Sequence, residues 1–156
     1  MQFEAAIALA EAHDERATDI LLHSMRHKSL RLDAIRALGT LGDRRAIVPL
    51  TRLLNKFFFP WADKLQAAAA LCALSDDTGA AYLKSKLYSR RDAERAAAIH
   101  FVGESRHPEA RVVLERILAD ARHPMRDVAA RALGLLGDPN SIAALNAAKS
   151  NADHDL

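Results

Sequence analysis

Residues 36–43 read Arg-Ala-Leu-Gly-Thr-Leu-Gly-Asp, and residues 131–138 read Arg-Ala-Leu-Gly-Leu-Leu-Gly-Asp, so seven of the eight positions agree. The two stretches are 95 residues apart, which is about three periods of 31 to 32 residues. Weaker copies lie between them and upstream of them. The chain is therefore predicted to consist of about five repeats of one structural unit.

Four columns of residues recur when the copies are aligned. A small residue marks the centre of each copy, at Ala10, Gly39, Cys72, Gly103 and Gly134. A basic residue stands eight positions earlier in four of the five copies, the column being Gln2, Arg31, Lys64, Arg95 and Arg126. A polar residue follows four positions later, at Asp14, Asp43, Asp76, His107 and Asp138. A leucine stands eleven positions later in every copy, at Leu21, Leu50, Leu83, Leu114 and Leu145.

One copy shows what the repeat should fold into. Residues 30–41 carry apolar side chains at helical spacing. Gly42 suits the left-handed end of that helix, and Asp43 can accept from the exposed N–H groups of a second helix over about 43–55. Gly39 costs the first helix about 1 kcal/mol relative to Ala. We expect close approach of the paired helix to offset this cost.

Each unit is thus a predicted two-helix hairpin, and hairpins of this kind must stack to bury both apolar faces. We expect one repeat domain over 1–151 and a polar tail over 152–156. The predicted units are about 2–28, 29–58, 59–89, 90–121 and 122–151.

The pattern Arg-Ala-Leu-Gly-x-Leu-Gly-Asp, followed by Ala-Ile-Val-Pro-Leu-Thr-Arg-Leu-Leu at 46–54, resembles the short HEAT-like repeat family first recognised in phycobilisome lyase subunits. The resemblance covers nearly the whole chain. It implies an all-α fold, a right-handed α-solenoid whose second helices line the concave side. Such repeats serve many functions, so the fold alone does not assign one.

Composition excludes several classes of protein. The 22 basic and 20 acidic residues give a net charge of +2, too small by itself to indicate a nucleic-acid or membrane partner. Cys72 is the single cysteine, so no intrachain disulfide can form. Residues 1–12 lack the basic region of a secretory signal, and no long uncharged apolar stretch occurs. These features predict a cytoplasmic protein.

The motifs of common enzymes are absent from the sequence. No nucleophile elbow, phosphate-binding loop or dinucleotide fingerprint occurs. The di-iron HEAT-repeat hydroxylases would require His-Glu pairs, and this chain has none. His23 and His27 have a spacing that can hold a metal, but we interpret them as solvated, and Cys72 as a core residue. We therefore predict no catalytic residue, cofactor or metal, with a bilin-lyase-like enzyme subunit as an alternative.

A partner-binding surface is predicted on the second helices of the first repeats. Residues 22–56 hold eight basic and two acidic side chains. The turn 57–61, Phe-Phe-Phe-Pro-Trp, adds four aromatic residues, either as an apolar plug or as an exposed contact site. The residues predicted to bind a partner are Arg16, His23, Arg45, Arg52, Lys56, Phe58, Trp61, Tyr82 and Arg116.

Three interpretations of this surface remain open. The first is a non-enzymatic scaffold that holds an acidic protein segment, and the second is nucleic-acid binding through the same basic strip. In the third, many of these charges lie on the convex side and only solvate the surface. The first helix is apolar on nearly every side, which predicts a longer array or docking on another molecule, such as a second copy.

Overall fold

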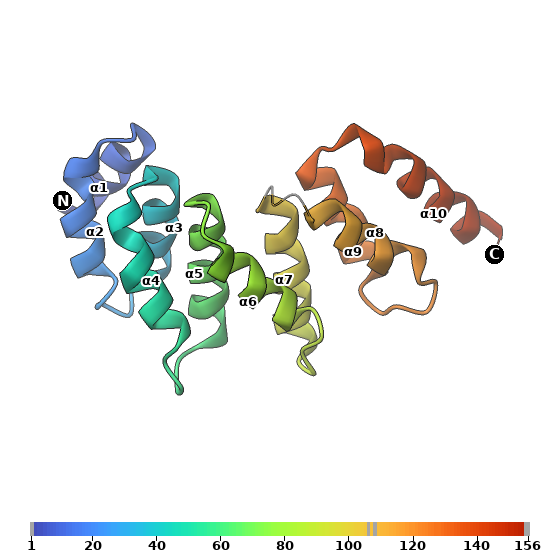
Figure 1. The fold of residues 1–156 in the computed structure, drawn as a ribbon, viewed down its shortest axis with the longest axis horizontal. Helices are drawn as coiled ribbons and strands as arrows, with labels where there is room; N and C mark the ends of the chain where they lie inside the picture. Colours follow the sequence, from blue (N-terminus) through green and yellow to red (C-terminus); the bar gives the residue numbers. More distant parts are fainter. Residues whose placement is uncertain (1, 106, 108, 155–156) are drawn as a thin grey trace. The chain divides into compact units, whose positions relative to one another are not determined.

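The computed structural model describes residues 2–105, 107 and 109–154, with side chains described up to residue 149. The described residues form ten α-helices and three short 3₁₀ turns, without a β-strand (Figure 1). Two compact units divide the chain, residues 1–85 and residues 86–156. The all-α class, built from two-helix repeats, is confirmed because each of the five predicted segments contains two helices.

Unit 1 is a stack of three hairpins. Its elements are α1 (Gln2–Glu11), a 3₁₀ turn (Glu15–Ala17), α2 (Thr18–Ser24), α3 (Arg31–Leu41), a 3₁₀ turn (Arg44–Ala46), α4 (Ile47–Leu54), α5 (Trp61–Ala73) and α6 (Asp77–Lys86), whose last residue already belongs to unit 2. The first helices pack in order, α1 on α3 and α3 on α5. Helix α2 packs against α1 and α3, and α4 packs against α5. This is the helix stacking of an α-solenoid.

Unit 2 repeats this arrangement with two hairpins. Its elements are α7 (Asp92–Glu104), α8 (Ala110–Ala119), α9 (Arg126–Leu136), a 3₁₀ turn (Pro139–Ser141) and α10 (Ile142–His154). Helix α7 packs on α9, and α8 packs on both α9 and α10. Residues 155 and 156 of the predicted polar tail lie outside the described residues. A single domain over 1–151 stays a prediction.

The polar column caps every second helix, as predicted. In each copy its side chain accepts a hydrogen bond from the backbone N–H two residues later, at 2.9–3.3 Å; the pairs are Asp14 with Arg16, Asp43 with Arg45, Asp76 with Thr78, His107 with Glu109, and Asp138 with Asn140. These bonds satisfy N–H groups that have no partner inside the helix.

The residue before the cap reverses the chain in a left-handed conformation. Gly42 and Gly137 have φ of 81° and 67°, as their position predicted. His13 and Ser75 occupy the same position in two other repeats, with φ of 56° and 58°. Those repeats make the same turn without glycine, so the turn is required by the hairpin and is not a consequence of the residue type.

The leucine column forms the centre of the core. Leu21, Leu50, Leu83 and Leu114 are at most 1% exposed, whereas Leu145 in the last repeat is half-buried. Four repeats therefore confirm the predicted inward direction of this column. In the last repeat, no further hairpin among the described residues covers the leucine.

The small column brings successive first helices together, which corrects our expectation about the paired helix. A Cβ added to Gly39 would lie 3.0 Å from Cα of Ala70 on α5. A Cβ added to Gly103 would lie 2.6 Å from the carbonyl oxygen of Ala132 on α9. Both contacts are with the first helix of the next repeat. Gly134 on α9 is exposed, and an added Cβ would meet no described atom within 4 Å.

In three repeats, the basic column joins the first helix to the C-terminal region of the second helix before it. Arg31 Nε donates to the carbonyl oxygen of Met25, Arg95 Nη1 to that of Ser89, and Arg126 Nε to that of Leu118, at 2.8–2.9 Å. These carbonyls lie at or near the C-terminal ends of α2, α6 and α8, where intrahelical partners are lacking. The column is therefore structural.

The glycines of the small column provide a matched test of this packing. Gly134→Ala should raise the free energy of unfolding by about 1 kcal/mol, because the added methyl group meets open space and alanine favours helix. Gly103→Ala should lower it by roughly 1–3 kcal/mol, because the methyl group would overlap the backbone of α9. Urea unfolding followed by circular dichroism measures both. Stabilisation by both substitutions would show that close approach is not the reason for Gly103.

Candidate partner-binding surface

Three of the predicted binding residues share one face of the second hairpin. Arg45 precedes α4, Arg52 lies in its last turn, and Lys56 follows its end. Their spacing of seven and four residues is the spacing of one helix face. All three side chains are exposed, and Val48, 56% exposed, lies between them. We call Arg45, Arg52 and Lys56 the α4 row.

Arg45 is also part of the structure that joins the first two repeats. Its guanidinium donates to Asp43 Oδ2 from Nε at 2.7 Å, and its Nη2 lies 2.6 Å from the same oxygen. The Nη2 group also reaches Thr18 Oγ1 and the carbonyl oxygen of Glu15, both at 3.2 Å. Arg45 therefore has a structural role that Arg52 does not share.

Asp43 is the buried centre of this network. Thr18, fully buried on α2, donates its hydroxyl to Asp43 Oδ2. Burial raises the pKa of Asp43, but the hydrogen bonds from Arg45 and Thr18 outweigh burial and hold the pKa at about 2. The carboxylate is thus charged at neutral pH and ties the turn between α3 and α4 to the first hairpin.

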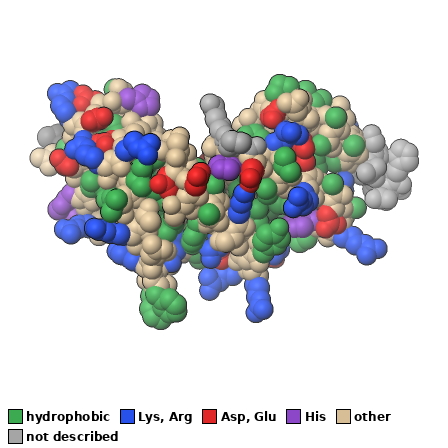
Figure 2. Space-filling model, in the orientation of Figure 1, with side chains coloured by type: hydrophobic (Ala, Val, Ile, Leu, Met, Phe, Trp, Pro, Cys, Tyr) green, Lys and Arg blue, Asp and Glu red, His purple; other side chains and the backbone are tan. Residues whose placement is uncertain are grey.

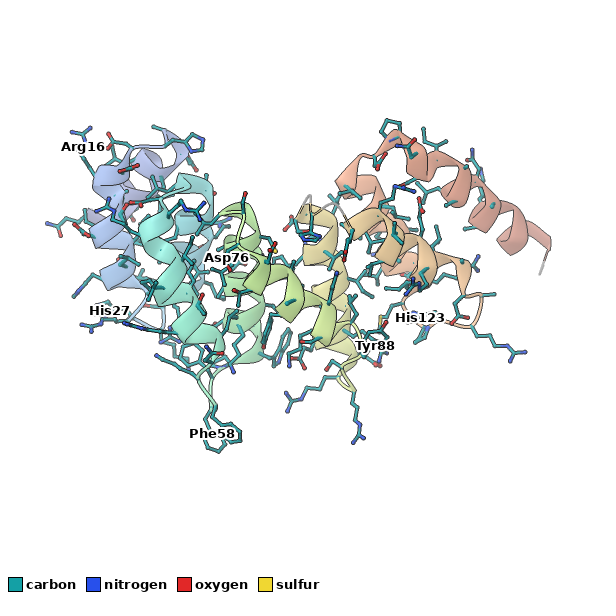
Figure 3. All side chains as sticks on the ribbon, viewed as in Figure 1. Arg16, His27, Phe58, Asp76, Tyr88 and His123 are labelled. Atoms are coloured by element: carbon teal, nitrogen blue, oxygen red, sulfur yellow. The ribbon has the colours of Figure 1, made fainter. Side chains whose placement is uncertain are left out.

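Arg16 lies at the opposite end of unit 1 from Phe58 (Figure 3), next to Glu15, whose carbonyl oxygen accepts from Arg45. Its guanidinium donates to Asp14 from Nε to Oδ1 at 3.0 Å and to Oδ2 at 2.9 Å, and from Nη2 to Oδ2 at 2.6 Å. These hydrogen bonds lower the pKa of Asp14 to about 2. Arg16 remains exposed, but its charge is already matched by the helix cap of its own repeat.

Four other predicted residues fall on four helices. His23 is exposed on α2, and its ring centroid lies 5.4 Å from that of His27. Within the described part of the chain, no three His, Cys, Asp or Glu side chains are grouped to hold a metal. Tyr82 on α6 and Trp61 at the start of α5 are half-buried. Arg116 is exposed on α8, in unit 2.

Cys72 has the environment of an unreactive thiol. It is partly buried on α5. Burial, with a smaller effect from the nearby charges of Asp76 and Asp77, raises the pKa of the Cys72 thiol to about 11. The thiolate that would act as a nucleophile is therefore disfavoured at neutral pH.

The phenylalanines in the turn between α4 and α5 differ in their exposure to solvent. Phe57 and Phe58 are 86% and 93% exposed, and their rings meet edge to face with centroids 4.7 Å apart. Figure 3 shows Phe58 at the tip of the turn, and Figure 2 shows a hydrophobic projection at the same place. Phe59 is half-buried, its ring centroid 4.8 Å from the Arg31 guanidinium and 4.9 Å from Lys56 Nζ.

The positive charge around the α4 row is only partly neutralised within the chain. Between residues 20 and 62 the acidic residues are Asp33 and Asp43, and they pair with Arg36 and Arg45. The basic residues of this segment that have no carboxylate partner in the described structure are Arg26, Lys28, Arg44, Arg52 and Lys56. The surface can therefore attract an anionic ligand.

The family model of the PBS lyase HEAT-like repeat matches residues 30–56 and 125–151, the second and fifth hairpins. These two hairpins match the PBS lyase HEAT-like repeat. Within each unit they stack on the neighbouring hairpins. Among solved structures, the chain is similar to human deoxyhypusine hydroxylase in complex with glycerol, with 19% identity and a TM-score of 0.47. The match covers 94% of this chain and 72% of that one.

No curated protein matches the sequence of this HEAT-like repeat chain. In the part of the chain that the structure describes, no helix is both long and apolar enough to cross a bilayer.

The Asp43 network predicts a pH-dependent contribution to stability. Asp43→Asn should lower the free energy of unfolding by about 2 kcal/mol at pH 7, because the charged bonds to Arg45 and Thr18 are lost. The folded pKa of Asp43, about 2, lies below the usual value of about 3.9, so its stabilisation is present above pH 4. It is lost as the pH falls from about 4 towards 2.

The difference between wild type and Asp43→Asn should therefore shrink over that pH range. Urea unfolding at pH 7 and at pH 3, followed by the fluorescence of Trp61, the only tryptophan, gives both differences. A difference that does not change with pH would contradict the role of the Asp43 charge.

Proposed function

We propose that this HEAT-like repeat chain is a non-enzymatic protein-binding scaffold that holds an acidic segment of a partner protein on the α4 row. The observation that carries the proposal is that Arg52 and Lys56, two exposed cations of the α4 row, have no carboxylate partner among the described residues, whereas Arg45 is held by Asp43. Carboxylates of a partner can pair with Arg52 and Lys56 without displacing an internal ion pair. Guanidinium groups also bind carboxylates with a defined geometry, which favours specific recognition.

The three cations of the α4 row differ in the contacts that they make within the chain. Arg52 has no carboxylate partner among the described residues and is the proposed main contact. Lys56 has its ammonium over Phe59, a contact that leaves its other donors available. Arg45 presents the exposed part of a guanidinium that Asp43 holds in place, so it is preorganised. Val48 offers an apolar contact between them.

Residues from neighbouring second helices extend the proposed surface. His23 on α2, and Tyr82 on α6 with Trp61 at the start of α5, are proposed to contact the same partner, because aromatic side chains contribute strongly to interfaces. Arg16 is proposed as a peripheral contact, and Arg116 as a separate contact on unit 2. A cytoplasmic location also belongs to the proposal, because a lone cysteine and no disulfide suit a reducing compartment.

The test is a pulldown from an extract of the source cells, with nuclease-treated and untreated halves compared by mass spectrometry. Wild type should retain one protein near stoichiometric amounts in both halves. Arg52→Glu combined with Lys56→Glu should lose at least about tenfold of it, since two attractive contacts become repulsive. Arg45 is left unchanged because its replacement would disturb the Asp43 network.

The matched control reverses two exposed charges in unit 2, Arg131→Glu with Lys149→Glu, and should retain the partner. Equal retention by the Arg52 and Lys56 variant would exclude the α4 row as the binding surface. Material that disappears on nuclease treatment would instead support nucleic-acid binding through the same cations.

A further inference from the structure

The most exposed large apolar side chains of the described residues all lie in turns between repeats. Phe57 and Phe58 are 86% and 93% exposed in the turn after α4, and Tyr88 is 83% exposed in the turn after α6. The other exposed large apolar residues reach at most 58%. The two turns belong to different units, so the feature occurs independently in each.

Free basic residues accompany these aromatic side chains. The turns that join one repeat to the next carry exposed cations, namely Arg26, Lys28, Lys56, Arg90, Arg91 and Arg122. The turns inside each repeat carry the caps, of which four are aspartates. Arg16 and Arg45 in these turns are paired with caps, and Arg44 is not. The hairpins of each unit therefore have a basic, aromatic end and an end that carries the acidic caps.

In unit 1 the two inter-repeat turns are held side by side by Arg31. Its Nε donates to the carbonyl oxygen of Met25 at 2.9 Å, in the first of these turns. Its guanidinium lies over the ring of Phe59, in the second turn, and pairs with Asp63 at 2.9 Å. The base of the aromatic turn is thus fixed, while Phe57 and Phe58 project from it into solvent (Figure 3).

We propose that the inter-repeat turns of unit 1 dock on the surface of an anionic lipid bilayer, with Phe57 and Phe58 entering the interface. Projecting aromatic rings need no pocket in a bilayer, because its interfacial region accepts them directly. Flanking Lys and Arg side chains then lie at the depth of the lipid phosphates. A single-stranded nucleic acid would instead require a basic groove that follows its backbone.

This function goes beyond the protein scaffold proposed above and is compatible with it. The aromatic tip lies beyond the C-terminal end of α4, whereas Arg45, Val48 and Arg52 lie along the helix. Contact of the turns with lipid would leave those side chains open to a protein. The chain would then present its protein partner at a membrane surface without crossing the membrane.

Sedimentation with lipid vesicles tests the proposal on the full chain. Vesicles of phosphatidylcholine with about 30 mol% phosphatidylserine should bind the protein at about 0.1 M salt, and pure phosphatidylcholine should not. Phe57→Ser with Phe58→Ser should weaken binding by at least about tenfold, because two apolar side chains no longer enter the interface. Arg26→Glu with Lys28→Glu, two exposed cations outside the α4 row, should weaken it as well, and so should higher salt.

The matched control is Leu135→Ser with Ile142→Ser, which removes two exposed apolar side chains, 54% and 58% exposed, outside these turns. It should bind vesicles like wild type, and circular dichroism checks that each variant is folded. Absence of wild-type binding, equal binding to both vesicles, or full binding by the phenylalanine variant would each overturn the proposal. Binding to a single-stranded oligonucleotide but not to vesicles would overturn it in favour of nucleic acid.

The two proposals fail separately. Phe58, predicted from the sequence as a protein contact, is assigned to the lipid interface. The phenylalanine variant should therefore still retain the protein partner in the pulldown through Arg52 and Arg45. If the phenylalanine variant loses that partner and wild type does not bind the vesicles, the aromatic turn is a protein contact and the lipid proposal is wrong.

Discussion

The close approach of successive first helices is the constraint on which the rest of the structure depends. At Gly39 and at Gly103 a methyl group would meet the backbone or Cβ of an alanine on the next first helix. This distance sets how tightly the hairpins stack, and the leucines of the second helices are buried only where stacking is complete. Glycine weakens the helix in which it stands, but it permits the close packing that buries the core of each unit.

Polar residues divide into those that build the stack and those that remain available to a ligand. Asp43, Arg45 and Thr18 form one buried junction, and Arg31 forms another with Met25 and Asp63. These groups are held by internal partners at short distances. Other cations, such as Arg52 and Lys28, have no carboxylate partner of this kind. Their exposure on the surface supports the binding proposals.

Much of the repeat was predictable from the sequence because its signals are local. The cap at Asp43 and the left-handed Gly42 are set by residues one or two positions apart, and both were predicted correctly. The helix that Gly39 approaches was predicted wrongly, because its neighbour, Ala70, is 31 residues away and belongs to another repeat. The binding surface was predictable only as a set of charges, since pairing within the chain depends on the folded geometry.

The sequence by itself determined the repeat, its two helices and the leucine core, since periodicity and capping act within one unit of about 31 residues. Tertiary structure alone decided which cations are engaged and which aromatic rings are exposed. Phe58 and Phe59 are adjacent and chemically identical, yet one projects into solvent and the other lies between Arg31 and Lys56. That difference arises from where the chain turns against a neighbouring repeat, which no local pattern specifies.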